Sequence, residues 1–504
     1  IPVLADRELT PVLDAYLFDF VKRTRGAAGW PLNVFLTPEG SPLVGTVYLP
    51  PAQFMTLLQQ LQERWQEHGA ELEQVARRVA RAANGTGSAA PLPAARLAPR
   101  LRQALLEASL DRADELAGGF GDQGKFPSAP QLDALLRLHA ERPDTRLGAF
   151  LRLTLDQMAG QGLRDHLGGG FFRYTVDPTW QEPRFEKMLF INAQLASLYL
   201  RAARVFGEAH YREVGLETVD FLLRELTHPD GGFIAGLAAT DGAGVDGGYY
   251  LWDRPTLRSL LGDKAYRLAT AVWGLGEEPL RVEGDLPVPQ VPMAVVAGVL
   301  GTDVAAAREQ VQGIREKLLA ARAKRDLPRD GLRIAAWNGL ALSALAAAVE
   351  AAPEPRYRQA GERLYGYLTD VLWRDGVLAR VRDPQGRAVA PGTLADYAYV
   401  ARGLEDWAAV AGTGDAVAQS VVQAAWRRFH TAGGWRPAAA AGLIGPARVL
   451  LPDGATPSPS AVLALASLRL ASPASDGALA AAGAVPASVL AHPFRFASYL
   501  TVLQ

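Results

Sequence analysis

The sequence predicts a mainly α-helical protein in which pairs of helices close into an (α/α)6 barrel, preceded by a smaller segment that mixes helix and strand. Two observations carry this prediction. From about Leu97 onward, apolar residues recur at helical spacing. Between the helical segments, a glycine pair followed by an aromatic residue recurs, as in Gly118–Phe120 and Gly231–Phe233.

This recurrence at intervals of some tens of residues indicates stacked helix pairs. The glycines allow turns with positive φ, and the aromatic side chain then fills the end of a helix layer. A ring of pairs needs no capping repeats, and the irregular spacing favours a ring; an open superhelix is the alternative. We expect helices at 100–116, 128–139, 147–161, 191–206, 211–226, 303–324, 337–351 and 357–372.

The N-terminal segment has a different pattern. We expect a helix at 12–21, then a β-hairpin of strands 34–36 and 44–49, and then an amphipathic helix from Phe54 to Val79. Residues 84–96 are rich in Gly, Ala, Ser and Pro, which is typical of a linker. The predicted division is therefore a domain at 1–83, a linker at 84–96 and a barrel at 97–504.

Composition excludes several classes of partner. The formal net charge is −1 and no basic run stands out, so nothing favours nucleic acid. No apolar stretch is long enough to span a bilayer, and the alanine-rich segment Leu340–Ala352 fits a buried helix better. The sequence begins at Ile1, and no signal peptide is visible from there onward, so we expect a cytoplasmic protein without a membrane partner.

The absence of cysteine excludes thiol chemistry. A chain with no Cys forms no disulfide, no thiolate nucleophile and no thiolate metal site. Neither a metal-ligand spacing nor a phosphate-binding or dinucleotide fingerprint is present, so no metal or cofactor is expected.

Several longer motifs carry a family resemblance over nearly the whole chain. They are Gly29–Pro38, Gly45–Pro50, Gly118–Pro127, Asp165–Gln194, Trp337–Leu340 and Asp396–Ala398. In the same order they resemble motifs of the spermatogenesis-associated protein 20 family, whose bacterial members are often called thioredoxin domain-containing proteins. The resemblance implies a thioredoxin-like domain followed by a six-hairpin (α/α)6 barrel similar to N-acylglucosamine and cellobiose 2-epimerases.

Departures from the family pattern remove polar groups. The segment Ala5–Glu8 is present without the Cys-His segment that precedes it in the family, so we expect a truncated thioredoxin-like domain in the given sequence. Pro31 occupies the place of a thioredoxin cis-proline, which we interpret as a retained structural turn. Arg184 stands where the family has His, and Leu332 where it has Lys. These changes indicate altered or lost chemistry.

The candidate catalytic residues are Glu186, Asp396 and His166. Hydrolysis of a glycosidic bond needs two carboxylates, and Glu186 and Asp396 lie in motifs, as do Asp122 and Asp177. Sugar epimerisation needs an acid and a base near neutral pH, for which His166 is the one histidine in a strong motif.

Each of these candidates has a structural alternative. We place Glu186 on a helix, where it could form an ion pair with Arg173 or Arg184, and His166 could simply pack at a helix end. The candidate ligand-binding set combines aromatic and polar side chains, as sugar clefts do. Its members are Lys125, Arg173, Trp180, Lys187, Trp337, Asn338 and Tyr397. Asn338 and Asp396 could instead cap helices.

Two functions remain open. The first is a carbohydrate-binding or carbohydrate-modifying barrel, epimerase-like or glycosidase-like, with a sugar or sugar-like ligand. The second is a catalytically inactive binding or scaffold protein with a protein partner. A deep pocket containing Arg173, Glu186 and Asp396 would favour the first; pairing of these groups away from a cavity would favour the second. A thiol-disulfide oxidoreductase is excluded for this chain by the absence of Cys.

Overall fold

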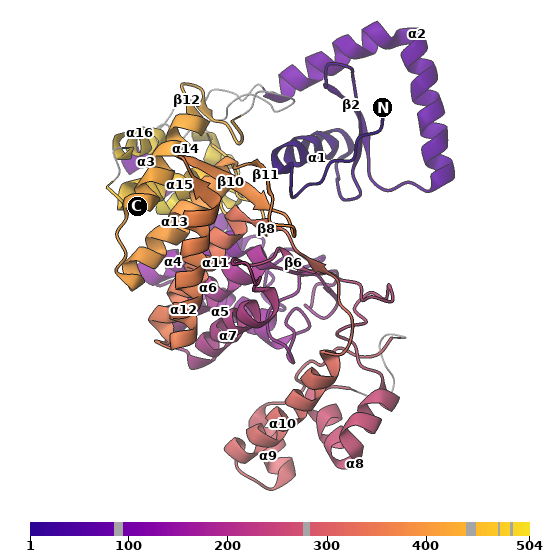
Figure 1. Ribbon diagram of the computed structural model, residues 1–504, viewed down its shortest axis with the longest axis vertical. Coiled ribbons are helices and arrows are strands. Elements are labelled where there is room, and N and C mark those ends of the chain that lie inside the picture. Colours follow the sequence, from indigo (N-terminus) through magenta and orange to yellow (C-terminus); the bar gives the residue numbers. More distant parts are fainter. Residues whose placement is uncertain (85–93, 276–282, 440–449, 472–473, 484–486, 504) are drawn as a thin grey trace.

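The computed structural model describes residues 1–84, 94–275, 283–439, 450–471, 474–483 and 487–503. Helices dominate and the strands are short, which confirms the predicted mainly α class. The helices form a barrel, with the N-terminal helix–hairpin–helix segment near one end of it (Figure 1).

The N-terminal segment contains the predicted elements. Helix α1 (Pro11–Arg25) ends at Gly26 in the left-handed conformation, and strands β1 (Asn33–Leu36) and β2 (Pro42–Thr46) pair antiparallel. Helix α2 (Pro51–Asn84) follows and is kinked at His68. The Trp30–Pro31 peptide bond is cis, as the resemblance implied. The second strand ends before the predicted residue 49, shortly ahead of the prolines that begin α2. Most of the predicted linker, 85–93, lies outside the described residues.

Six inner helices form the ring. They are α4 (Ala129–Glu141), α6 (Leu189–Phe206), α11 (Ala335–Ala351), α13 (Leu394–Ala411), α15 (Pro459–Arg469) and the 3-10 helix η4 (Pro493–Thr501). Each packs against the next, and η4 packs against α4, which closes the circle. The sequence therefore folds as the predicted closed barrel and not as an open superhelix.

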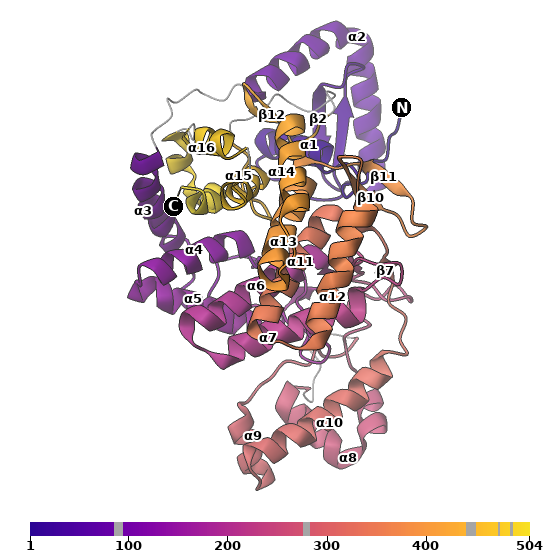
Figure 2. The same ribbon diagram turned by 60° about the vertical axis from the view of Figure 1, so that its left-hand side comes forward.

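An outer layer surrounds this ring (Figure 2). Its helices are α3 (Ala94–Leu110), α5 (Thr145–Gly160), α7 (Ala209–Phe221) with η1 (Leu222–Leu226), α12 (Pro355–Gly366) with η2 (Tyr367–Leu372), α14 (Ala416–Phe429) and α16 (Ser475–Gly483). The alanine-rich helix α11 lies in the ring with most of its residues buried, as its composition predicted.

Two glycines allow the closest approach in the ring. A Cβ on Gly339 of α11 would lie 2.4 Å from the carbonyl oxygen of Tyr399, and one on Gly403 would lie 2.3 Å from the carbonyl oxygen of Gly339. Helices α11 and α13 therefore pack backbone against backbone, which any larger residue at either position would prevent.

Short strands join the helices at the end of the barrel where the inner helices begin. The pairs are β3 (Tyr174–Thr175) with β4 (Pro183–Arg184), β5 (Lys187–Met188) with β6 (Gly236–Leu237) and β7 (Arg329–Asp330), β8 (Arg333–Ile334) with β10 (Val377–Arg382), β10 with β9 (Trp373–Arg374) and β11 (Ala388–Pro391), and β12 (His430–Thr431) with β13 (Gly434–Trp435). Glu186 lies between β4 and β5, so its predicted place on a helix is wrong. Backbone pairing of β5 with β6, far along the chain, holds this segment extended.

An inserted helical unit separates β6 from β7. Helices α8 (Arg254–Trp273), α9 (Met293–Leu300) and α10 (Val304–Arg322) pack on one another around their own apolar core and project from the barrel (Figure 1). Of these, only α10 matches a helix predicted from sequence. No helix in the described part of the chain is long and apolar enough to cross a membrane.

Candidate functional site

Two asparagine side chains hold glycine–aromatic turns; Asn338 belongs to the predicted site and Asn192 does not. Gly169 and Gly170 both have positive φ, at 71° and 72°. Asn192 then binds both backbone groups of Phe171: its Oδ1 accepts from the amide at 2.6 Å and its Nδ2 donates to the carbonyl at 3.0 Å. Asn338 binds Phe233 in the same way, at 2.7 and 3.0 Å. Asn338 therefore fixes a turn from within α11 and does not cap a helix, so the capping alternative is wrong for this residue.

Two buried lysines support glycine–aromatic turns: Lys187 the turn before Phe171, and Lys125 the turn before Phe120. Lys187 Nζ donates to Asp165 at 2.6 Å and to the carbonyl of Gly169 at 2.7 Å. Lys125 Nζ donates to Asp114 at 2.8 Å. Both aspartates accept backbone amides two and three residues ahead, so the two turns are built alike.

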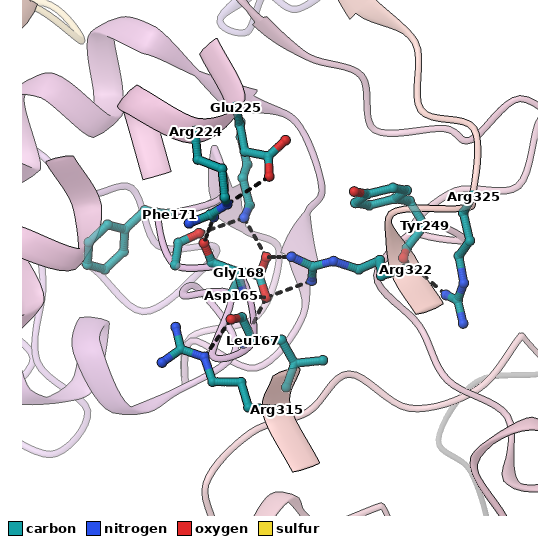
Figure 3. A network of polar contacts seen from close by, with 12 residues as sticks. Asp165, Leu167, Gly168, Phe171, Arg224, Glu225, Tyr249, Arg315, Arg322 and Arg325 are labelled. Atoms are coloured by element: carbon teal, nitrogen blue, oxygen red, sulfur yellow. Dashed lines mark hydrogen bonds and ion pairs between the residues drawn. The ribbon is translucent and has the colours of Figure 1, made fainter. Parts of the chain in front are cut away.

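Asp165 is the centre of a buried ionic network (Figure 3). Arg322, at the end of α10, reaches it from the inserted unit with Nη atoms at 3.0 and 2.9 Å. Burial alone would raise the pKa of Asp165, but Arg322 and Lys187 hold it well below its usual range. Burial lowers the pKa of Lys187 to about 8 even beside this carboxylate. Arg315 also binds this loop, donating to the carbonyl of Leu167 at 2.6 Å.

Asp396 is fully buried and makes structural contacts. It closes a capping box with Thr393 at the start of α13, accepts the amide of Ala336 at 3.0 Å, and pairs with Arg380 at 2.9 Å. Arg380 also donates to the carbonyl of Glu8 at 2.7 and 2.9 Å. Asp396 thereby fixes the arginine that ties the N-terminal segment to the barrel.

The remaining predicted residues lie in separate places. Glu186 pairs with Arg173 at 3.4 Å, one of the two partners expected for it. Trp180 is buried and donates to the carbonyl of Ala117 at 2.9 Å. Trp337 packs against Phe190 with ring centroids 4.8 Å apart.

Tyr397 and His166 are also engaged internally. The Tyr397 hydroxyl accepts the amide of Leu378 at 2.9 Å. His166 Nε2 lies 2.9 Å from the carbonyl oxygen of Gln161, and burial together with Arg164 lowers its pKa to about 3. His166 borders a cleft of about 700 Å³ between the barrel and the inserted unit. A histidine with this pKa stays neutral at physiological pH.

A cavity of about 610 Å³ lies in the lumen, lined by residues of all six inner helices. None of the predicted site residues lines it. Its charged lining comes from the middle and C-terminal parts of the inner helices, whereas the motif loops precede their N-termini. We call these side chains the lumen cluster: Asp133, Arg137, Arg201, Arg402, Glu405, Asp406 and Arg469.

Ion pairs organise the lumen cluster. Asp133 of α4 accepts from Arg137 Nε at 2.8 Å and from Arg201 Nε of α6 at 2.7 Å. Burial opposes ionisation of Asp133, but these two arginines hold its pKa far below the usual range. Across the ring on α13, Arg402 binds Asp406 through two nitrogens, at 2.9 and 2.7 Å.

Glu405 is the loosely held carboxylate of the cluster. Its nearest cationic atoms, on Arg402 and Arg469, are each 3.7 Å away, beyond hydrogen-bond distance. Glu405 Oε2 and the hydroxyl of Thr413, which also lines the cavity, are buried and have no hydrogen-bond partner among the described residues. Burial raises the pKa of Glu405. Unpartnered buried polar atoms facing a cavity mark a place where a ligand or water completes the hydrogen bonding.

Sequence reasoning missed the lumen cluster, although a signal was present. Asp133 and Arg137 are four residues apart, as are Arg402 and Asp406, within helices that are otherwise largely apolar. Paired charges on the inner helices of a ring point to a polar lumen once the inner helices are known.

The chain is similar in sequence to one family model and to several known proteins. Residues 1–84 match the family Thioredox_DsbH, described as "Protein of unknown function, DUF255". Spermatogenesis-associated protein 20 of Homo sapiens is 32% identical over 458 residues, covering 81% of this chain, and that of Rattus norvegicus is 31% identical over the same length. The chain is therefore similar to spermatogenesis-associated protein 20 over about four-fifths of its own length. It spans 58% of the human relative's length.

Solved structures with a similar outline were also found. Cellobiose 2-epimerase from Bacillus thermoamylovorans has a TM-score of 0.49 at 8% identity, covering 76% of this chain and 85% of that one. The GH76 α-mannanase BT2949 of Bacteroides thetaiotaomicron has a TM-score of 0.46 at 9% identity, covering 81% and 94%. The barrel assignment rests on the closed ring of inner helices described above.

Proposed function

We propose that the barrel binds a sugar or sugar-like molecule in its lumen, at the lumen cluster. The observation that carries this proposal is the pair of unpartnered buried oxygens, Glu405 Oε2 and Thr413 Oγ1, on the wall of the cavity. Its volume of about 610 Å³ falls within the range of small-molecule sites.

The chemistry of the wall supports a polyhydroxylated ligand. A sugar hydroxyl both donates and accepts a hydrogen bond. The lumen cluster offers both kinds of partner side by side, because carboxylates accept and guanidinium groups donate. Stacking aromatic residues do not line the described part of the cavity, so binding would depend on hydrogen bonds.

If the barrel also modifies its ligand, the lumen holds two carboxyl groups in contrasting environments. Glu405 has a raised pKa and is suited to hold a proton, whereas Asp133 stays ionised between two arginines. Such a contrast is the usual basis for dividing acid and base roles. The catalytic roles of Glu186, Asp396 and His166 stay predictions; the experiment below tests whether Glu186 and Asp396 take part in ligand binding.

A second candidate function is non-catalytic binding of a protein partner. The observation that favours it is the internal engagement of the motif residues: Arg173 pairs with Glu186, and Arg380 with Asp396, away from the lumen cavity. Charged groups that pair with one another outside a cavity are what a scaffold protein would show.

Thermal-shift measurements against mono- and disaccharides test the proposal. A ligand that binds only the folded chain raises Tm by mass action. We expect a shift with at least one sugar that Glu405→Gln abolishes, while Glu115→Gln, a matched change on the exposed surface, preserves it. A shift lost in Glu186→Gln or Asp396→Asn but kept in Glu405→Gln would place the site at the motif loops instead. No shift with any sugar would favour the scaffold.

A further inference from the structure

We infer that the lumen ligand carries an oxyanion, either a carboxylate or a phosphoryl group, which the arginines of the lumen cluster bind. This inference rests on the proposed function of the same cavity. It concerns the chemical class of the ligand: an acidic sugar or a sugar phosphate in preference to a neutral sugar.

The first argument is the balance of charge. Four guanidinium groups in the cluster, Arg137, Arg201, Arg402 and Arg469, meet three carboxylates, Asp133, Glu405 and Asp406. Three further ionic groups line the wall: Glu350 and Arg204 pair with each other at 2.7 Å, and Asp415, at the start of α14, is exposed to water. Within the cluster itself the guanidinium groups outnumber the carboxylates by one, and Arg469, with 41% of its side chain exposed, is open to solvent on one side.

The second argument is the number of free donors. Arg137 and Arg201 each bind Asp133 through Nε, and among the described residues their terminal Nη groups have no acceptor. Arg469 has only its 3.7 Å approach to Glu405. Three arginines from α4, α6 and α15 thus present unused N–H groups to one cavity. Guanidinium groups with free paired donors match the geometry of carboxylate and phosphate.

The arginines also repel one another. Burial and the neighbouring Arg402 and Arg137 lower the pKa of Arg469. Asp133 raises the pKa of Arg201, but burial and the charge of Arg137 together lower it by more, so the net shift of the pKa is downward. An anion bound between them would relieve this repulsion. The helix dipole stabilises the positive charge of Arg469, which lies at the C-terminal end of α15. Arg402 lies in the middle of α13 and gains no such stabilisation.

Isothermal titration of the full chain tests the inference. The probes are glucose, mannose and galactose, their uronates and their 6-phosphates, with acetate and inorganic phosphate as anions without a sugar. We expect at least one uronate or sugar phosphate to bind tenfold or more tightly than its parent hexose. The uronate arm and the phosphate arm identify which oxyanion the site takes.

Variants separate the oxyanion subsite from the rest of the cavity. Arg469→Gln is expected to remove the preference for the anionic sugar, so that the uronate or phosphate and its parent hexose bind with similar affinity. Arg146→Gln is the matched control, because Arg146 forms an exposed ion pair with Glu115 away from the lumen. Far-ultraviolet circular dichroism of each variant confirms that it is folded.

The outcomes distinguish the two proposals. Equal binding of neutral and anionic sugars, or a preference that survives Arg469→Gln, overturns the oxyanion subsite and leaves the sugar site standing. Binding of acetate or phosphate as tightly as of the sugars supports the oxyanion subsite and overturns the sugar ligand. No binding of any probe overturns both.

Discussion

Replacing Asp165 by asparagine is expected to destabilise the barrel by about 3–5 kcal/mol. The carboxylate is 2% exposed and touches two cations, Lys187 at 2.6 Å and Arg322 at 2.9 Å. Asparagine keeps the oxygen that accepts the backbone amides of the turn but loses the charge. Removing one partner of a buried ion pair leaves an uncompensated buried charge, and here it leaves two.

Urea unfolding, followed by the fluorescence of the ten tryptophans, measures the loss. A second probe such as circular dichroism is needed, because a chain of this size need not unfold in one step. Asp122→Asn, at an exposed residue, is the matched control. A loss below about 1 kcal/mol, or no larger than that of the control, would refute the reasoning, since it would mean that the pair contributes no more than a surface ion pair.

A double variant separates charge from hydrogen bonding. Adding Lys187→Met to Asp165→Asn removes one uncompensated cation, so part of the lost stability should return. The pH dependence gives an independent check. Because the folded-state pKa of Asp165 is depressed, its stabilisation is present above the unfolded-state value of about 4 and is lost as pH falls further. The difference between wild type and Asp165→Asn should therefore be constant above pH 5 and shrink below pH 4.

Three further predictions concern stability. Burial raises the pKa of Asp453 to about 6, so the folded chain binds this proton more tightly than the unfolded chain does. The free energy of unfolding should therefore fall by about 2–3 kcal/mol from pH 4 to pH 7. In urea titrations, Asp453→Asn should remove that dependence on pH. Gly339→Ala should destabilise the barrel by at least about 2 kcal/mol, because the added Cβ clashes with the backbone of α13. Gly313→Ala on α10, where the Cβ meets open space, is the control and should be neutral or stabilising by up to about 1 kcal/mol. Equal effects of the two changes would contradict the close approach of α11 and α13. Arg380→Gln should free residues near Glu8 for limited proteolysis without unfolding the barrel, and unchanged cleavage would refute its tethering role beside Asp396.

Local features of the chain were predicted well because their causes are local. Helix periodicity identified three of the six inner helices, α4, α6 and α11, and the glycine pairs marked turns with positive φ, since both depend on neighbouring residues. The absence of Cys excluded thiol chemistry without any structure. The capping role considered for Asp396 was also a matter of residues a few positions apart, and the structure confirms it.

The ionic contacts, by contrast, were decided by the tertiary structure. Lys187 and Asp165 lie in one predicted motif and form an ion pair. The second cation that contacts Asp165 is Arg322, which comes from an inserted helix far along the chain. Glu186 was placed on a helix because the pairing of β5 with β6 cannot be read from nearby residues.

The lumen cluster shows the same limit most clearly. Sequence alone determined that this chain is mainly helical, that without Cys it has no thiol chemistry, and where several of its glycine turns lie, whereas closure of the ring was a prediction that the structure confirmed. Which charged residues face one cavity depends on how helices from four separate parts of the chain are rotated about their axes. Packing of the whole ring sets that rotation, so Glu405 and its arginines became a candidate site only when α4, α6, α13 and α15 were seen together.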